Sequence, residues 1–85
     1  MKPVTYSRSA QRALKKIPRN IADLIVSKID QYASEPSSLT NNIKILKGDF
    51  AGLVRLRVGD WRVIMDDRGN VLSIMEIKPR GGAYE

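Results

Sequence analysis

Cysteine and histidine are both absent from this 85-residue chain. Without cysteine no disulfide can form, and without either residue the chain has no Cys- or His-ligated metal site. The absence of histidine also removes the commonest general acid–base group and the Ser-His and Cys-His nucleophile pairs. Any catalysis therefore depends on Lys, Arg, Tyr, Asp or Glu side chains, and we expect neither a metal nor another cofactor.

Long apolar runs are missing as well. The N-terminal sequence MKPVTYSRSA has no apolar segment of the kind found in signal peptides, and no stretch approaches the length of a membrane span. We therefore expect a cytoplasmic protein that does not associate with a membrane. The chain length and a hydrophobic content of 42% predict one globular domain over residues 1–85.

Positive charge is in clear excess. Fifteen Lys and Arg against nine Asp and Glu give a net charge of +6. On so small a domain, this charge favours a polyanion or an acidic protein as the partner. A positive surface that only keeps the protein soluble is the alternative.

The first half of the chain predicts a short strand followed by two helices. Residues 3–6 alternate like a strand, and apolar residues then recur at helical spacing of three and four. The first helix would bury Ala10, Ala13, Leu14 and Ile17, and the second would bury Ile21, Leu24, Ile25, Ile29 and Tyr32. Ser7 can cap the first helix, and Pro18 separates the two, so they should form an antiparallel hairpin. Residues 34–42 predict a polar loop.

After residue 43 the apolar period changes from 3.6 to 2. Residues 43–48 form either an edge strand or an extended segment, and clearer strands are predicted at 53–58, 61–66 and 71–78. In the last strand either alternating set of side chains could face the core. The order β-α-α-β-β-β predicts an α+β fold, with an antiparallel twisted sheet and the N-terminal helical hairpin packed on one face.

The polar face of this sheet carries several arginines. The turn at residues 59–60 places Arg57 directly opposite Arg62, with Arg55 on the same face. Like charges in directly opposite positions are destabilising, so we expect an anion to bind here. Asp60, Asp66 and Glu76 can pair with some of these arginines, but they are too few to neutralise all of them.

Two further basic residues and a tyrosine extend this set. Lys78 and Arg80 join it if the last strand turns Lys78 toward the arginines, and Tyr84 follows on the tail. Arginine makes bidentate contacts with phosphate, and tyrosine can stack on a base. Single-stranded nucleic acid is therefore the expected ligand.

A second basic group lies on the first predicted helix. Lys15 and Lys16 accompany Arg8, Arg12 and Arg19, and this face is either simply solvated or in contact with an RNA backbone. The neighbouring pair Asp66 and Asp67 is interpreted as turn residues and not as a metal site.

The segment DFAGLVRLRVGDWRVIMDDRGNVLSIMEI and the closing RGGAY resemble the toxins of the RelE/ParE superfamily from bacterial and archaeal toxin–antitoxin operons. The similarity covers nearly the whole chain, which would be a single RelE-like toxin domain. It implies a cognate antitoxin whose commonly acidic segment wraps the toxin, and hence a hetero-oligomer. It does not separate the RNA-cleaving branch from the gyrase-poisoning branch.

The RelE branch, which we favour, implies ribosome-dependent cleavage of mRNA in the A site by attack of the 2′-OH on the adjacent phosphate without a metal. The resemblance then implies catalytic roles for Arg55, Arg62, Lys78, Arg80 and Tyr84, and we expect Arg57, Lys47, Lys15 and Lys16 to bind RNA. Leu53 replaces a lysine of the best-known member, which leaves Lys78, Lys47, or phosphate and water to remove the proton. The alternatives are a ParE-like inhibitor of DNA gyrase without nuclease activity and a nucleic-acid-binding module of the same fold.

Overall fold

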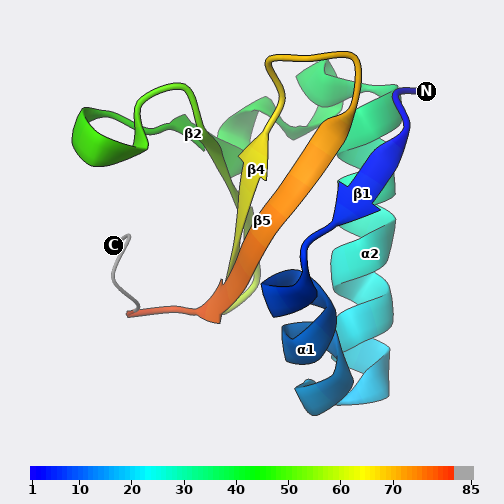
Figure 1. The fold of residues 1–85 in the computed structure, drawn as a ribbon. Coiled ribbons are helices and arrows are strands. Elements are labelled where there is room, and N and C mark those ends of the chain that lie inside the picture. Colours follow the sequence, from blue (N-terminus) through cyan, green and yellow to red (C-terminus); the bar gives the residue numbers. More distant parts are fainter. Residues whose placement is uncertain (82–85) are drawn as a thin grey trace.

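The computed structural model describes residues 1–81. Its elements, in chain order, are β1 (Val4–Tyr6), α1 (Arg8–Lys16), α2 (Arg19–Ser34), the 3-10 segment η1 (Pro36–Asn42), β2 (Ile43–Ile45), the 3-10 turn η2 (Gly48–Phe50), β3 (Val54–Val58), β4 (Trp61–Asp66) and β5 (Leu72–Pro79). The five strands form one sheet in the order β1-β5-β4-β3-β2, and α1 and α2 lie together beside it (Figure 1). The predicted α+β fold is confirmed.

Local signals define the helical hairpin as predicted. Ser7 is the N-cap of α1, where its Oγ accepts a hydrogen bond from the Ala10 N–H at 3.0 Å. Pro18 is the N-cap of α2, where its missing N–H costs nothing. The region predicted as a polar loop instead contains η1, because Leu39 is only 5% exposed and anchors this segment in the core.

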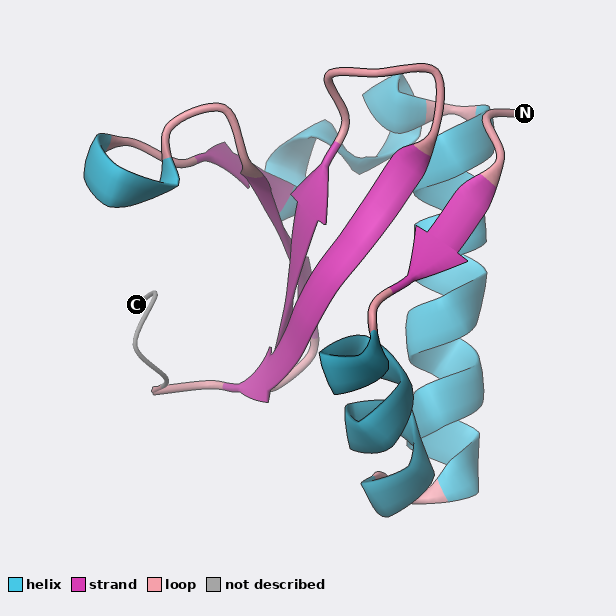
Figure 2. Ribbon diagram, viewed as in Figure 1, coloured by secondary structure: helices cyan, strands magenta, loops and turns pink. Residues whose placement is uncertain are grey.

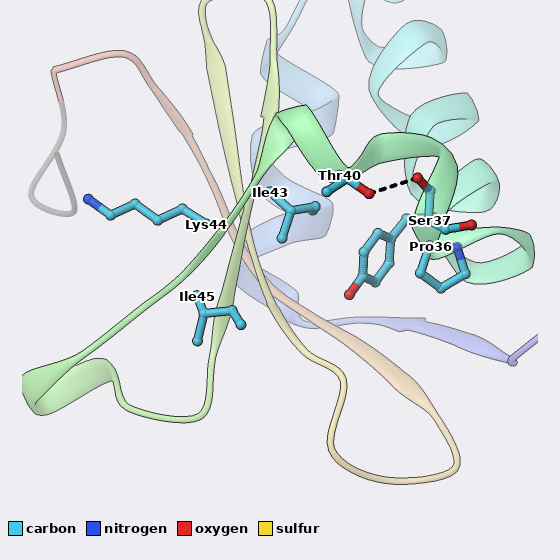
Figure 3. A pocket seen from close by; sticks show the side chains of 7 residues that line it. Pro36, Ser37, Thr40, Ile43, Lys44 and Ile45 are labelled. Carbon is cyan, nitrogen blue, oxygen red and sulfur yellow. Dashed lines mark hydrogen bonds between the residues drawn. The ribbon is translucent and has the colours of Figure 1, made fainter.

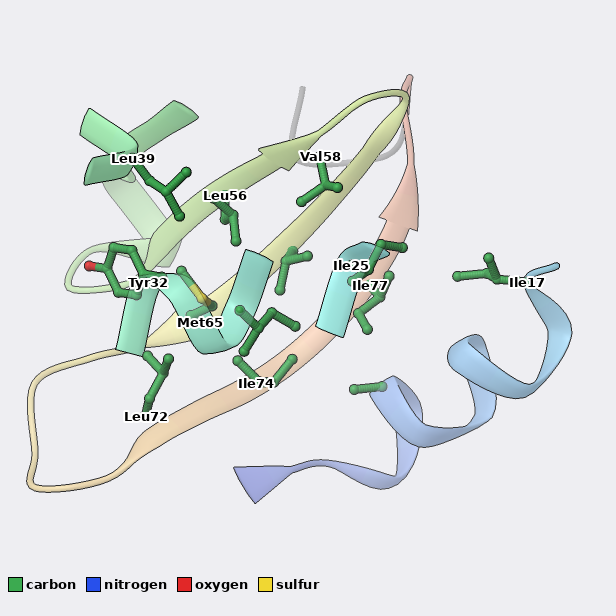
Figure 4. Packing of buried hydrophobic residues seen from close by; sticks show 13 residues of the cluster. Ile17, Ile25, Tyr32, Leu39, Leu56, Val58, Met65, Leu72, Ile74 and Ile77 are labelled. Carbon is green, nitrogen blue, oxygen red and sulfur yellow. The ribbon is translucent and has the colours of Figure 1, made fainter. Parts of the chain in front are cut away.

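The core lies between α2 and the sheet. Ile25 and Ile29 are fully buried against residues of the central strands, such as Leu56 and Ile74, as Figure 4 shows in part. Leu24, which we expected in the buried stripe, is 48% exposed. The prediction was wrong because the i, i+4 row through Ile25 and Ile29 faces the sheet, which turns position 24 toward the edge of that stripe.

Two edges complete the sheet. Residues 43–45 form the edge strand β2, which is antiparallel to β3 and is flanked by η1 and η2 (Figure 2). At the opposite edge β1 pairs with β5, and Val4 aligns with Leu72. This pair is parallel, although we expected only antiparallel pairs, because the two helices return the chain before the remaining strands are added.

A β-bulge resolves the ambiguity in the last strand. Met65 pairs with Ile74 while Ile64 pairs with Glu76, so Met75 is an extra residue in β5. Leu72 and Ile74 face the core before the bulge, and Ile77 faces it afterwards. Each of the two alternating sets therefore faces the core over part of the strand, and the bulge turns Lys78 to the side away from the helices.

Candidate anion-binding site

Four basic residues share the sheet face that points away from the helices. We call Arg55, Arg57, Arg62 and Lys78 the arginine face. The core-facing neighbours of these residues, such as Leu56, Val58 and Val63, are buried, which fixes the basic residues on the other side. The positions therefore follow from the alternation that the sequence predicted.

Three of these cations lie in one row across three strands. Arg57 pairs with Arg62 on β4, and Arg62 pairs with Lys78 on β5. Directly opposite residues have Cβ atoms about 4.5–5.5 Å apart, where like charges are destabilising. A phosphate placed over this row would relieve that repulsion.

The hairpin turn holds Arg62 in place. Gly59 has a φ of 57°, which glycine adopts without strain and which lets the chain reverse in two residues. Arg62 Nη1 donates to the carbonyl oxygens of Gly59 at 3.1 Å and Trp61 at 3.2 Å, and the residue is only 7% exposed. Its guanidinium is thus positioned before any ligand binds.

A second row beside the first contains Lys44, which the sequence reasoning missed, and Glu76, which it named only as a possible counter-charge to the arginines. Lys44 pairs with Arg55, Arg55 with Ile64, and Ile64 with Glu76. Glu76 also lies near Lys78, with 3.9 Å between Oε1 and Nζ. The register of β2 brings Lys44 to the arginine face and the bulge in β5 brings Glu76 there, and no local sequence signal fixes either register.

Two carboxylates at the end of β4 are engaged elsewhere. Asp66 accepts two hydrogen bonds from the Arg68 guanidinium, at 2.9 and 3.1 Å. These bonds, with one from the Arg68 N–H, lower the pKa of the Asp66 carboxyl to about 2. Asp67 binds Lys2 and Tyr32. Asp66 is the last residue of β4 and Asp67 follows it, so only Asp67 lies in the connection that we predicted for both, and neither carboxylate is directed to the arginines of the row.

The remaining predicted site residues lie in different places. Arg80 is exposed just beyond β5, and its N–H donates to the Asp60 carbonyl at 2.6 Å, so it remains at the hairpin end of the arginine face. Lys47 is exposed in the connection between β2 and η2. Lys15 and Lys16 belong to α1, in the helical layer. Tyr84 lies outside the described residues.

A separate pocket of about 600 Å³ opens between η1 and β2 (Figure 3). Lys44 is the one residue of the two rows on the arginine face that also lines this pocket. The lining residues are Tyr32, Pro36, Ser37, Thr40, Ile43, Lys44 and Ile45.

Within residues 1–81 no cluster of acidic side chains could hold a metal ion. Neither α1 nor α2 has the length and apolar content that a membrane span requires.

The sequence matches the family described as ParE toxin of type II toxin–antitoxin system, parDE, over residues 4–84. A search of curated proteins gave no match. Among solved structures, a chain of the archaeal RelE–RelB complex from Pyrococcus horikoshii has 29% identity and a TM-score of 0.76, over 98% of this chain and 100% of that chain. A chain of the toxin–antitoxin complex RelBE2 from Mycobacterium tuberculosis has 26% identity and a TM-score of 0.76, over 93% and 98% respectively. A YafQ mutant from E. coli shares the fold at 12% identity, with a TM-score of 0.78 over 100% of both chains.

Proposed function

The chain belongs to the ParE toxin family of type II toxin–antitoxin systems, within the RelE/ParE superfamily, and from this premise we propose that it is a ribosome-dependent endoribonuclease of the RelE type. The observation that carries the proposal is the row Arg57–Arg62–Lys78. A gyrase inhibitor that only binds protein has no need for three cations converging on one anion. A phosphodiester held for cleavage needs them, because negative charge grows on the phosphoryl oxygens in the transition state.

In the proposed reaction the mRNA 2′-OH gives up its proton and its oxygen attacks the adjacent phosphorus. The bond to the 5′ oxygen breaks, and that oxygen takes up a proton, so the products are a 2′,3′-cyclic phosphate and a 5′-hydroxyl end. Arg62 and Arg55 hold the phosphate, and Arg57 and Arg80 hold the neighbouring backbone. Tyr84 stacks on a base. The reaction needs only an oxygen nucleophile, a phosphate group and proton transfers, and we assign no role in it to a metal.

Proton transfer in this scheme falls to the pair formed by Lys78 and Glu76. An arginine side chain stays protonated and is a poor base, whereas an amine or a carboxylate can accept a proton. Lys78 is in register with Arg62, and Glu76 is 3.9 Å from its ammonium. Lys47 lies outside both rows, so we assign it to backbone binding.

The partner that restrains this activity is a cognate antitoxin. The similar chains from Pyrococcus horikoshii and Mycobacterium tuberculosis were both solved in toxin–antitoxin complexes. The net charge of +6 favours a partner with an acidic segment, since opposite charges steer the two proteins together and raise the association rate. We place both the inactive hetero-oligomer and the free toxin in the cytoplasm, where ribosomes and mRNA are found.

The test is primer extension on mRNA bound to programmed ribosomes. The wild-type protein should cleave in the A site, and Arg62→Lys, which keeps the charge but removes the planar fork, should cleave about 10²-fold more slowly. Arg62→Ala and Tyr84→Ala extend the series. Arg68→Gln is the matched control, because Arg68 is bound to Asp66 and lies off the row.

Two results would contradict the proposal. Equal cleavage by the wild-type protein and Arg62→Lys would show that Arg62 does not hold the phosphate in the way we propose. Absence of cleavage together with inhibition of gyrase supercoiling would instead support the ParE-like alternative, which the family description favours. Circular dichroism of each variant establishes that a loss of cleavage is not a loss of folding.

A further inference from the structure

Lys44 lies at the edge of the sheet, on the same side as the arginine face, and has no part in the reaction described above. It is the middle residue of β2, it pairs with Arg55 on β3, and it is exposed. Its side chain forms no ion pair or hydrogen bond with any residue in the range 1–81. Figure 3 shows that it extends away from Ile43 and Thr40. The ammonium group is therefore available to a ligand on the arginine face.

The second row is positively charged at one end only. Lys44 and Arg55 occupy its β2 and β3 positions, Ile64 on β4 is 1% exposed, and Glu76 ends the row on β5. Ile64 offers a phosphate no hydrogen bond, and the carboxylate of Glu76 repels it. A phosphate on this row would therefore lie between Lys44 and Arg55, where it relieves the repulsion between two directly opposite cations.

This position differs from that of the scissile phosphate. Arg62 Nη1 is bonded to the Gly59 carbonyl, so the Arg62 guanidinium lies toward the hairpin turn. Lys44 lies two strands away and one row further from that turn, which places the two backbones about 12 Å apart. Neighbouring rows are two residues apart, roughly 6–7 Å along a strand, and one nucleotide of an extended RNA strand spans a comparable length.

We propose that Lys44 and Arg55 form a second phosphate subsite, which binds the phosphate one nucleotide away from the scissile phosphate. The inference rests on the proposed function in that the ligand is a single RNA strand, and it adds the path of that strand. The RNA crosses the sheet obliquely from Arg80, at the hairpin end, over the first row to Lys44, at the β2 edge. Two phosphates held at fixed points orient the sugar between them, which one contact cannot do.

The test compares single-stranded oligonucleotides that contain one, two or three phosphates. Their sugars carry 2′-O-methyl groups, so that they cannot be cleaved, and NMR titration of the isotope-labelled protein measures their affinities. The wild-type protein should gain about fivefold from the second phosphate, the upper value for one exposed ion pair. Lys44→Gln should bind the one-phosphate ligand as tightly as the wild-type protein and should lose this gain. Its salt slope for the two-phosphate ligand should fall by about 0.7.

Two further variants serve as controls. Lys28→Gln removes the same charge from α2, in the helical layer, and should bind all three ligands like the wild-type protein. Arg62→Lys alters the first row and should weaken binding of every ligand, including the one that contains a single phosphate. The dependence on phosphate number thus separates the two rows.

Four outcomes would overturn the inference. An equal loss for the one-phosphate ligand in Lys44→Gln would place Lys44 on the scissile phosphate. The same losses in Lys28→Gln would show that only net charge matters. Unchanged binding of all ligands would leave Lys44 the role of a charged residue that prevents pairing at an edge strand. Loss of binding to an acidic peptide alone would identify a protein partner at this position.

These outcomes are distinct from failure of the proposed function, because the binding test requires neither ribosomes nor cleavage. Cleavage on ribosomes by the wild-type protein, without a gain in affinity from the second phosphate, would reject only the subsite. A gain in affinity that depends on Lys44, without cleavage on ribosomes, would reject only the nuclease.

Discussion

At the scale of single residues, position in the sheet gives the same side chain different roles. Arg62 is 7% exposed and is bonded to two turn carbonyls, whereas Arg68 is exposed and is paired with Asp66. The first guanidinium is fixed beside other cations, and the second is neutralised by a carboxylate. The same side chain thus stabilises a hairpin turn in one position and forms an exposed ion pair in the other.

Tyr32 provides a prediction about pH. Its side chain is nearly buried and its hydroxyl donates to Asp67 Oδ2 at 2.9 Å. Burial, and then the bond and the charge of Asp67, raise the pKa of the Tyr32 phenol from 10 to about 12. A pKa that is higher in the folded chain adds stability that is complete below pH 10 and is lost as the pH rises toward 12.

We therefore expect the wild-type protein to be about 1–2 kcal/mol more stable than Tyr32→Phe near neutral pH, because the bond to a charged acceptor is lost. This advantage should shrink between pH 10 and 12. Urea denaturation at a series of pH values measures it, and absorbance titration should show that the highest tyrosine transition is missing in the variant. A stability difference that stays constant to pH 12 would contradict the assignment.

At the scale of elements, one residue links the start of α1 to the sheet by side-chain hydrogen bonds. Ser7 Oγ accepts from the Ala10 N–H and donates to the Met75 carbonyl at 2.6 Å, so it caps the helix and also ties its start to the bulge of β5. The helix that carries Arg8, Arg12, Lys15 and Lys16 is thus joined to the strand that carries Lys78.

Ser7→Ala should lower the free energy of unfolding by about 1 kcal/mol, the usual loss for an N-cap. Ser7→Thr keeps a hydroxyl at the same position and should lose less. Thermal denaturation monitored by circular dichroism measures both. If the alanine variant were as stable as the wild-type protein, the two hydrogen bonds would have no net effect and α1 would be held by its apolar contacts alone.

At the scale of the whole molecule, one ion pair joins the N-terminal segment to the connection between β4 and β5. Lys2 Nζ binds both the side chain and the backbone carbonyl of Asp67, 65 residues away, and joins the N-terminal segment to the turn before β5. Asp67 also accepts from Tyr32 of α2. The start of the chain, the helical layer and the sheet therefore meet at one carboxylate.

A double-mutant cycle with Lys2→Met and Asp67→Asn tests this closure. The two side chains are partly exposed, 30% and 26%, so we expect a coupling free energy of about 0.5–1 kcal/mol, and high salt should reduce it. Additive effects of the two substitutions would show that the pair contributes nothing beyond its separate contacts. Lys28→Met combined with Asp67→Asn, which does not share this contact, should be additive.

Much of this architecture follows from local sequence. The Ser7 cap, Pro18 and the period change after residue 43 predict the helical hairpin and the strands, because capping and amphipathic spacing act within a few residues. The two-residue turn at 59–60 also fixes which arginines face each other. The family resemblance adds the expected function, which composition alone does not reach.

Other features depend on contacts between distant segments. The exposure of Leu24, the burial of Leu39 and the parallel pairing of β1 with β5 arise when α2 and η1 pack against the sheet. Local periodicity does not contain that information, since it does not specify which of several apolar rows meets a partner.

The sequence by itself determined that positive charge gathers on one sheet face and on α1, because alternation and helical spacing fix which side chains share a face. Only the tertiary structure decided that these are two separate surfaces, with the core between them. It also decided, through one extra residue in β5, that Lys78 and Glu76 join the arginines. A register shift is set by the pairing of strands across the sheet, and no single strand can encode its partner.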